Sequence, residues 1–179
     1  MEKLFKQLSD VQATLFTLFH KTWVYHWGVT GPDFYQLHSI FGEQYEEMFK
    51  EIDRLSEHMR YLGMKPVSTL SRITEVSVIE QATDSSQNLT AKIMVKQLLQ
   101  DNQTLIDFTL DTHNTASRLE SLGTTNILED ILESHGKYVW MLRSMAESTR
   151  GSSPVEDVAD MAPEEPVQEE TEQELPETE

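Results

Sequence analysis

The chain has 179 residues, 38% of them hydrophobic, which is enough for one buried core and too few for two. It contains no cysteine, which excludes disulfides, thiolate metal sites and cysteine nucleophiles, so any metal must be held by His, Asp and Glu. The formal net charge of −17 and the lack of any Lys/Arg cluster argue against a nucleic-acid-binding protein.

The first predicted element is a long helix over residues 3–27. Its apolar side chains recur every three or four residues, which indicates one buried face: Leu4, Leu8, Val11, Leu15, Leu18 and Phe19. The start of this segment is amphipathic rather than signal-like, and no apolar run in the chain reaches the roughly 18 residues that cross a bilayer. We therefore expect a soluble, cytoplasmic protein without a membrane partner.

The stretch GVTGPDF interrupts this helix, and Pro32 is suited to opening the next one. The second helix is predicted over 34–62, with Gly63 as the residue that follows its end. The connection from 66 to 88 is too long for an antiparallel hairpin, and the pattern TLSRITEVSVI within it indicates a short helix.

Two further helices are predicted, one from about residue 88 to Gly123 and one from about Thr125 onward, both with apolar residues at helical spacing. Four long helices with a long central connection match an all-α, ferritin-like four-helix bundle with a short helix between the second and third. We place this domain at residues 1–149.

Residues 150–179 differ sharply in composition from the rest of the chain. From position 151 they carry 11 of the 31 acidic residues and no Lys or Arg, which leaves the remainder at about −6. Such a segment has too few apolar residues to offset its ordering entropy, so we expect a disordered acidic tail. It is either a solubilising extension or a docking segment for a basic partner.

Two histidines, His26 and His38, lie on either side of the first turn, where an antiparallel helix pair brings them together. Asp53 and Glu57 are four residues apart, so both carboxylates project from one face of the second helix. Imidazole and carboxylate donors suit iron. Histidines and i, i+4 acids are also common on long helices without any metal, and this alternative stays open.

One chain cannot bring all four groups to one ion. His38 and Asp53 are 15 residues apart, which separates them by roughly 22 Å along a helix. No Glu is followed three places later by His, so the usual intrachain di-iron motif is missing. A two-fold dimer with antiparallel second helices and an axis near Glu46 would join the histidines of one chain to the carboxylates of the other.

The stretch HWGVTGPDFYQLH, followed by FGEQYEE and EIDRLSEHMRYLG, resembles the signature of the Dps family, the DNA-binding proteins from starved cells. YVWML at 138–142 resembles the usual end of that family's last helix. The resemblance implies that His26, His38, Asp53 and Glu57 are ferroxidase ligands shared across a dimer interface. It covers the whole chain except the tail.

The resemblance also implies a dodecameric cage that oxidises Fe(II), preferably with hydrogen peroxide and alternatively with O2, and stores Fe(III) inside, which protects against oxidative damage. Trp27, beside His26, is similar to a residue proposed to intercept stray oxidising equivalents; an aromatic interface anchor is the alternative. Zinc is a second possible occupant of the site.

The chain departs from the family pattern in several places. Dps proteins usually carry an Asp where this chain has Gly42, which predicts weaker binding of a second iron; Glu43 points about 100° around the helix. An Asp that helps to line the entry pore of many relatives appears here as Asn126. The acidic residues that follow it could still attract cations, so the candidate pore residues are Asn126, Glu129, Asp130 and Glu133. DNA binding in the family usually depends on a Lys/Arg-rich terminal extension, whereas this chain ends in an acidic tail. We therefore expect this protein not to bind DNA.

Two other functions remain open on the sequence alone. One is a Dps-like structural shell with a weak or inactive ferroxidase site. The other is an interaction protein that acts through its acidic tail. The remaining histidines match no motif and are expected at surface or packing positions: His20, His58, His113 and His135.

Overall fold

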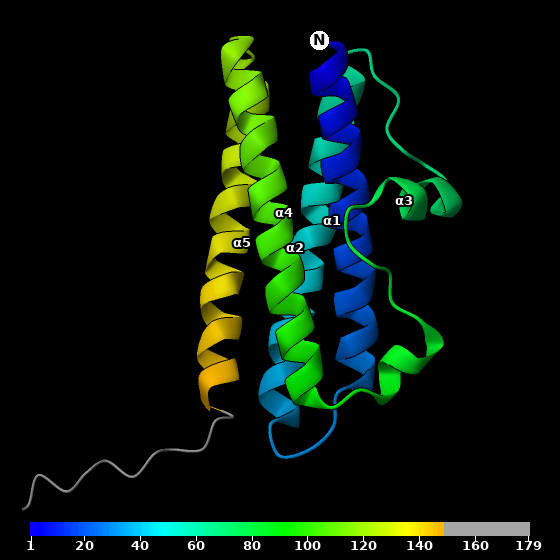
Figure 1. The fold of residues 1–179 in the computed structure, drawn as a ribbon, viewed down its shortest axis with the longest axis vertical. Coiled ribbons are helices and arrows are strands. Elements are labelled where there is room, and N and C mark those ends of the chain that lie inside the picture. Colours follow the sequence, from blue (N-terminus) through cyan, green and yellow to red (C-terminus); the bar gives the residue numbers. More distant parts are fainter. Residues whose placement is uncertain (149–179) are drawn as a thin grey trace, which may run out of the picture.

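The computed structural model describes residues 1–148, and every regular element within them is a helix, as predicted (Figure 1). Its elements are α1 (Glu2–Gly28), α2 (Phe34–Tyr61), α3 (Leu70–Val76), the 3-10 helix η1 (Asp84–Asn88), α4 (Ala91–Arg118) and α5 (Leu122–Ser148). Among these, no helix combines the length and the apolar character needed to span a membrane. The acidic tail expected over 150–179 lies outside the described residues.

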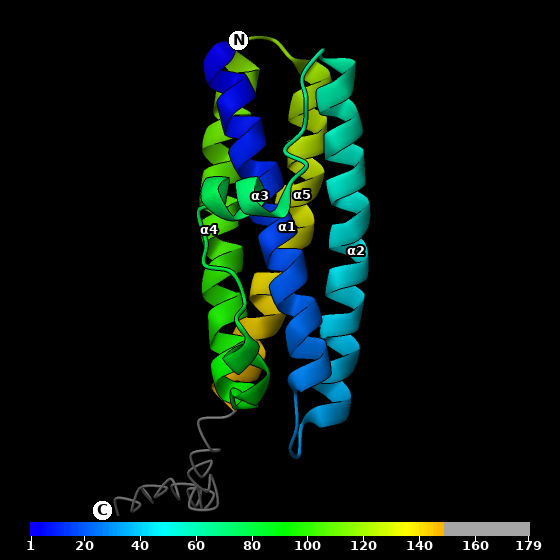
Figure 2. The same ribbon diagram turned by 90° about the vertical axis from the view of Figure 1, so that its right-hand side faces the viewer.

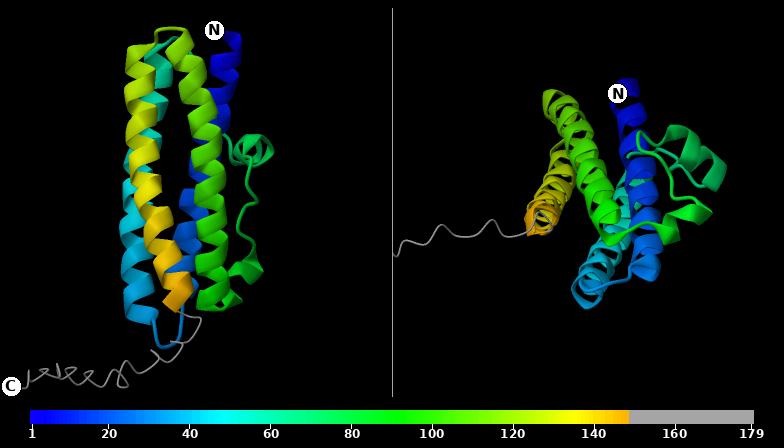
Figure 3. Two further views of the ribbon diagram at one scale, coloured as in Figure 1. Left: turned by 60° about the vertical axis from the view of Figure 1, so that its left-hand side comes forward. Right: turned by 60° about the horizontal axis from the view of Figure 1, so that its bottom comes forward.

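The four long helices form a bundle of two antiparallel pairs, α1 with α2 and α4 with α5, in which α2 and α4 run in the same direction (Figures 1, 2 and 3). The connection between the pairs, which carries α3 and η1, runs back along the outside of α1 so that α4 can start at the same end as α2 (Figure 2). The two pairs meet mainly through α1 and α4, whereas α2 and α5 make fewer contacts. The predicted ferritin-like architecture is thereby confirmed.

The core consists of the apolar stripes that the sequence pattern indicated. The α1 positions repeat every three or four residues and are completely buried at Leu4, Leu8, Val11, Leu15 and Leu18. They pack in one cluster with side chains of the other long helices, among them Phe41, Met48, Leu98, Leu105 and Leu128. Burial of these side chains, each contributing about 1.5–3 kcal/mol, holds the two helix pairs together.

Two glycines occupy positions where a side chain would clash with the backbone or strain it. A Cβ atom on Gly28 would lie 2.8 Å from the backbone of Gln87, so a glycine lets η1 close against the end of α1. Gly63 has φ +81°, as expected for the residue after a helix, and its N–H donates to the Arg60 carbonyl. The Met64 N–H donates to the Met59 carbonyl, which completes a Schellman motif.

The predicted end of the third long helix near Gly123 is wrong, because α4 ends at Arg118. The left-handed residue that ends it is Glu120, with φ 55°, and the same pair of Schellman bonds forms around it. Gly123 instead lies in the first turn of α5, where an added Cβ would be 3.2 Å from Cε1 of His58. A non-glycine residue at the left-handed position hid this boundary from the sequence pattern.

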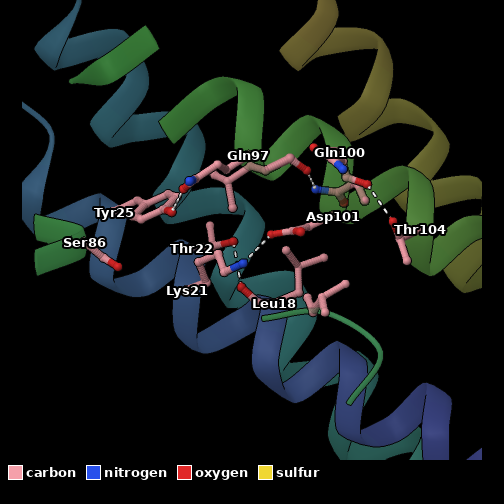
Figure 4. Close-up of polar contacts among 12 residues, drawn as sticks. Leu18, Lys21, Thr22, Tyr25, Ser86, Gln97, Gln100, Asp101 and Thr104 are labelled. Carbon is pink, nitrogen blue, oxygen red and sulfur yellow. Dashed lines mark hydrogen bonds and ion pairs between the residues drawn. The ribbon is translucent and has the colours of Figure 1, made fainter. Parts of the chain in front are cut away.

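A polar network joins the last turns of α1 to the first turns of α4 (Figure 4). Lys21, almost fully buried, donates to the Asp101 carboxylate at 2.6 Å, and the Tyr25 hydroxyl donates to the Gln97 side-chain oxygen. Burial raises the pKa of Asp101, an effect that the Lys21 ammonium opposes. Burial, and then the Asp101 charge, raises the pKa of Tyr25 to about 12, so its hydroxyl stays protonated and remains a donor.

Candidate metal centre

His26 and His38 meet across the turn between α1 and α2, as their spacing predicted. Their rings are stacked, with centroids 3.7 Å apart and planes inclined by 20°. His26 lies in the last turn of α1 and His38 in the second turn of α2, so the turn at 29–33 sets their separation. Phe34, one turn before His38, stacks on the outer face of the His38 ring at 5.0 Å.

Reciprocal hydrogen bonds orient the two rings. Nδ1 of His26 donates to the His38 carbonyl at 2.7 Å, and Nδ1 of His38 donates to the His26 carbonyl at 2.8 Å. Because a carbonyl only accepts, each Nδ1 carries a proton, and a neutral ring then has its lone pair on Nε2. This is the arrangement of metal-binding histidines, whose second nitrogen is held by a backbone or carboxylate oxygen.

An aromatic strip on the outer face of α1 and α2 surrounds the pair. The Tyr45 ring contacts the His26 ring edge-on at 5.2 Å, and Trp23 packs against Trp27 at 4.7 Å. Large parts of this strip are exposed: 37% of Trp23, 52% of Trp27 and 63% of Phe49. Such a patch of large aromatic side chains is typical of a surface that another protein covers.

Asp53 and Glu57 lie on α2, one turn apart, and both are exposed. The structure does not bring them to the histidines. Over residues 1–148, no group of three or more His, Asp or Glu side chains is placed to hold one metal ion. Each chain therefore presents two separate groups of candidate ligands, the two imidazoles beside the first turn and the two carboxylates further along α2.

Gly42 faces the histidine pair directly. A Cβ atom at this position would lie 3.3 Å from Cε1 and 3.5 Å from Nδ1 of His26. This chain therefore has no acidic side chain at the position on α2 that adjoins the His26 ring. Glu43, the neighbouring carboxylate, lines the groove between α2 and α5 instead, which does not favour a replacement role.

The four candidate pore residues are all exposed near the start of α5. Asn126 and Glu129 line a hollow between the ends of α4 and α5, and Glu129 accepts a hydrogen bond from Nε2 of His113 at 2.9 Å. Asp130 forms an ion pair with Arg54 of α2. Their role at a pore stays a prediction, since a pore would form only between chains.

The sequence interpretation did not use the aromatic strip as a unit. A usable signal was present, because Phe19, Trp23 and Trp27 are spaced by four residues on α1, and Tyr45 and Phe49 by four on α2. Aromatic residues with this spacing lie on one helix face. The exposure of Trp23, Trp27 and Phe49 became evident only from the packing of the two helices.

Comparison with known proteins identifies the family to which this chain belongs. The ferritin-like domain model matches residues 5–152. The chain is 33% identical over 144 residues to DNA protection during starvation protein 2 of Bacillus anthracis, covering 80% of this chain and 94% of the relative. The chain belongs to the Dps family of ferritin-like proteins.

Solved Dps structures superpose closely on this chain. Dps from Staphylococcus aureus matches with a TM-score of 0.77 and 27% identity, covering 82% of this chain and 96% of that one. The Dps protein from Vibrio cholerae, described as a member of a broad superfamily of ferritin-like diiron-carboxylate proteins, matches with a TM-score of 0.75 and 26% identity, covering 80% and 89%. The chain therefore shares the bundle fold of these Dps proteins.

Proposed function

We propose that this Dps family protein is a ferroxidase and iron store, in which Fe(II) is oxidised at sites shared between two chains. The observation that carries the proposal is the histidine pair, whose Nδ1 protons are held by backbone carbonyls so that Nε2 of His26 and of His38 is available to a metal. The diiron-carboxylate description of the Vibrio cholerae relative supports iron as the substrate.

The second half of each site comes from a partner chain. The carboxylates of Asp53 and Glu57 lie too far along α2 to reach their own histidines, and an antiparallel pairing of two α2 helices brings them to the partner's imidazoles. The exposed aromatic strip beside His26 supplies the apolar surface for that pairing. Two equivalent sites form in each dimer, and dimers assemble further into the cage, a dodecamer in our proposal.

The ligand set accounts for the chemistry. Carboxylates and neutral imidazoles stabilise Fe(III) relative to Fe(II), which favours transfer of an electron from the substrate to the oxidant. Hydrogen peroxide accepts two electrons, one from each of two Fe(II) ions, and two protons to give two water molecules, so its complete reduction at a confined site avoids release of hydroxyl radicals; O2 is the alternative oxidant. Trp27 contacts Trp23 and adjoins His26, where it either anchors the interface or intercepts a stray oxidising equivalent.

The same site can bind zinc, because Zn²⁺ accepts the same imidazole and carboxylate donors. Because residue 42 is a glycine, the site has one carboxylate fewer, and we expect the second iron to bind more weakly. A structural shell with low activity is therefore the rival function. We place the protein in the cytoplasm. We also propose that it binds no DNA, since neither its net charge of −17 nor its charge pattern attracts a polyanion.

The test is oxidation of Fe(II) by metal-free protein. Fe(II) is added anaerobically, hydrogen peroxide follows, and Fe(III) formation is read optically in the wild type and in a His26→Ala/Asp53→Ala variant. Rapid oxidation in the wild type and its loss in the variant are expected. Equal rates in the two proteins and in buffer would overturn the ferroxidase proposal and leave the structural shell.

A further inference from the structure

A second set of metal-binding side chains lies inside the bundle, away from the histidine pair. His135 of α5 is completely buried, whereas histidine is a residue of only intermediate burial on average. Its neighbours come from three helices: Glu51 from α2, Asn102 from α4 and Ser134 from α5. The packing position expected for His135 is confirmed, but its contacts are polar rather than apolar.

Hydrogen bonds fix the orientation of the His135 ring. The Asn102 amide nitrogen donates to the Leu98 carbonyl at 2.7 Å, which directs the amide oxygen toward His135. Nδ1 of His135 lies 2.6 Å from this oxygen and must donate to it. In the neutral ring, the lone pair is therefore on Nε2.

Nε2 of His135 lies 3.2 Å from one carboxylate oxygen of Glu51. The other carboxylate oxygen accepts a hydrogen bond from the Ser134 hydroxyl, so the carboxylate is oriented as firmly as the ring. A neutral imidazole and an ionised carboxylate then present lone pairs to each other. Such an approach in the interior is favourable only when a cation, either a proton or a metal ion, lies between the two groups.

The pair has the features of a metal site. A histidine ligand normally donates its other N–H to an oxygen acceptor, as His135 does to Asn102, and a ligating carboxylate is itself hydrogen-bonded, as Glu51 is by Ser134. Two donors at about 2.0–2.1 Å from a tetrahedral ion lie about 3.3 Å apart. The observed separation of 3.2 Å is close to that value.

A groove between α2 and α5 leads to Ser134, beside the pair. It has a volume of about 310 Å³, and its lining includes Glu43, Gln44, Glu47, Ser134 and Tyr138. Gln44 is 1% exposed, and neither atom of its amide has a hydrogen-bond partner within the described residues, so the groove wall offers unused polar groups to a hydrated ion. Lys137 also lines the groove, and Glu47 pairs with Lys50 at 3.1 Å, so the carboxylates of Glu43 and Glu47 at the entrance are largely offset by basic groups.

We propose that Glu51 and His135 form an intrachain site for one divalent transition-metal ion. The ion is bound by the Glu51 carboxylate and by Nε2 of His135, and water from the groove completes its coordination. Imidazole with carboxylate selects ions of the class of Zn²⁺, Fe²⁺ and Co²⁺ over Mg²⁺ and Ca²⁺. This site requires no partner chain, and it does not depend on the shared sites proposed above.

The test uses Co²⁺ as a spectroscopic probe on the full-length protein. The His26→Ala/His38→Ala/Asp53→Ala/Glu57→Ala background removes the shared site, and binding is followed by visible absorption and by metal analysis after gel filtration. We expect one Co²⁺ per chain in this background. Adding Glu51→Gln should weaken its binding by about tenfold to 100-fold or more, since a ligand is lost.

The matched control is Glu75→Gln on α3, an exposed carboxylate outside the groove, which removes an equal charge without touching His135 and should leave Co²⁺ binding unchanged. His135→Leu should abolish binding; if this variant does not assemble, Glu51→Gln, which preserves the side-chain shape, decides the question alone. Absence of Co²⁺ from the background protein, or binding that Glu51→Gln leaves intact, would overturn the proposal and assign a proton to the pair. Because the shared site is absent from this background, the result is independent of the ferroxidase test.

Discussion

Replacing Gly42 with aspartate tests whether this chain lacks a ligand at the shared site. The new Cβ would lie 3.3 Å from Cε1 of His26, so the ring has to move by a few tenths of an ångström. We expect the carboxylate to reach a metal ion held by Nε2 of His26. Even at the dielectric constant of water, one charge about 4 Å from a divalent ion contributes about 2 kcal/mol, or about 30-fold in affinity.

The assay is anaerobic binding of Fe(II) to Gly42→Asp, followed by calorimetry, with the initial oxidation rate as a second readout. Gly42→Asn is the matched control, since it has nearly the same shape and no charge, and Gly42→Ala reports the steric effect on His26 alone. We expect tighter binding and faster oxidation in the aspartate variant only. Equal Fe(II) affinity in the aspartate and asparagine variants would refute the view that a missing carboxylate limits this site.

Three further outcomes are expected. Glu120→Gly should stabilise the protein by about 0.5–1 kcal/mol, because a glycine adopts φ 55° without strain; no rise in the thermal midpoint at fixed concentration would contradict this. Tyr25 has a pKa raised to about 12, so between pH 10 and 12 the unfolded chain loses this proton while the folded protein keeps it, and stability falls as pH rises. Tyr25→Phe should make that fall shallower in urea unfolding, and an unchanged pH dependence would argue against it. The full-length protein should give no shift of duplex DNA in a gel at neutral pH and low salt, and a salt-sensitive shift would show that the expectation is wrong.

The parts of the structure that local spacing determines could be predicted. The apolar period of 3–27 indicated α1, and Gly63 marked the end of α2, because glycine at a left-handed position is a strong local signal. The end of α4 was missed for the converse reason: Glu120 occupies the left-handed position, and Gly123 lies one turn too late. The 3-10 helix η1 was not predicted either, since its five residues carry no apolar period.

The candidate site, too, could be predicted only where local spacing determines it. His26 and His38 are 12 residues apart across a turn, so their meeting follows from helix geometry, whereas the carbonyl bonds that set both tautomers depend on backbone positions that no spacing encodes. The contact of Glu51 with His135 joins residues 84 apart on two helices. It depends on the rotation of α5 against α2, which only the packed bundle determines.

Subunit mixing tests the shared-site claim most directly. A His26→Ala/His38→Ala chain and an Asp53→Ala/Glu57→Ala chain are each expected to be inactive in Fe(II) oxidation by hydrogen peroxide. If they are unfolded together and reassembled, random pairing makes about half of the dimers mixed, each with one complete site, so about a quarter of the wild-type activity should return. Activity that stays at the level of the separate variants, in assemblies shown to be mixed, would contradict a site built from two chains.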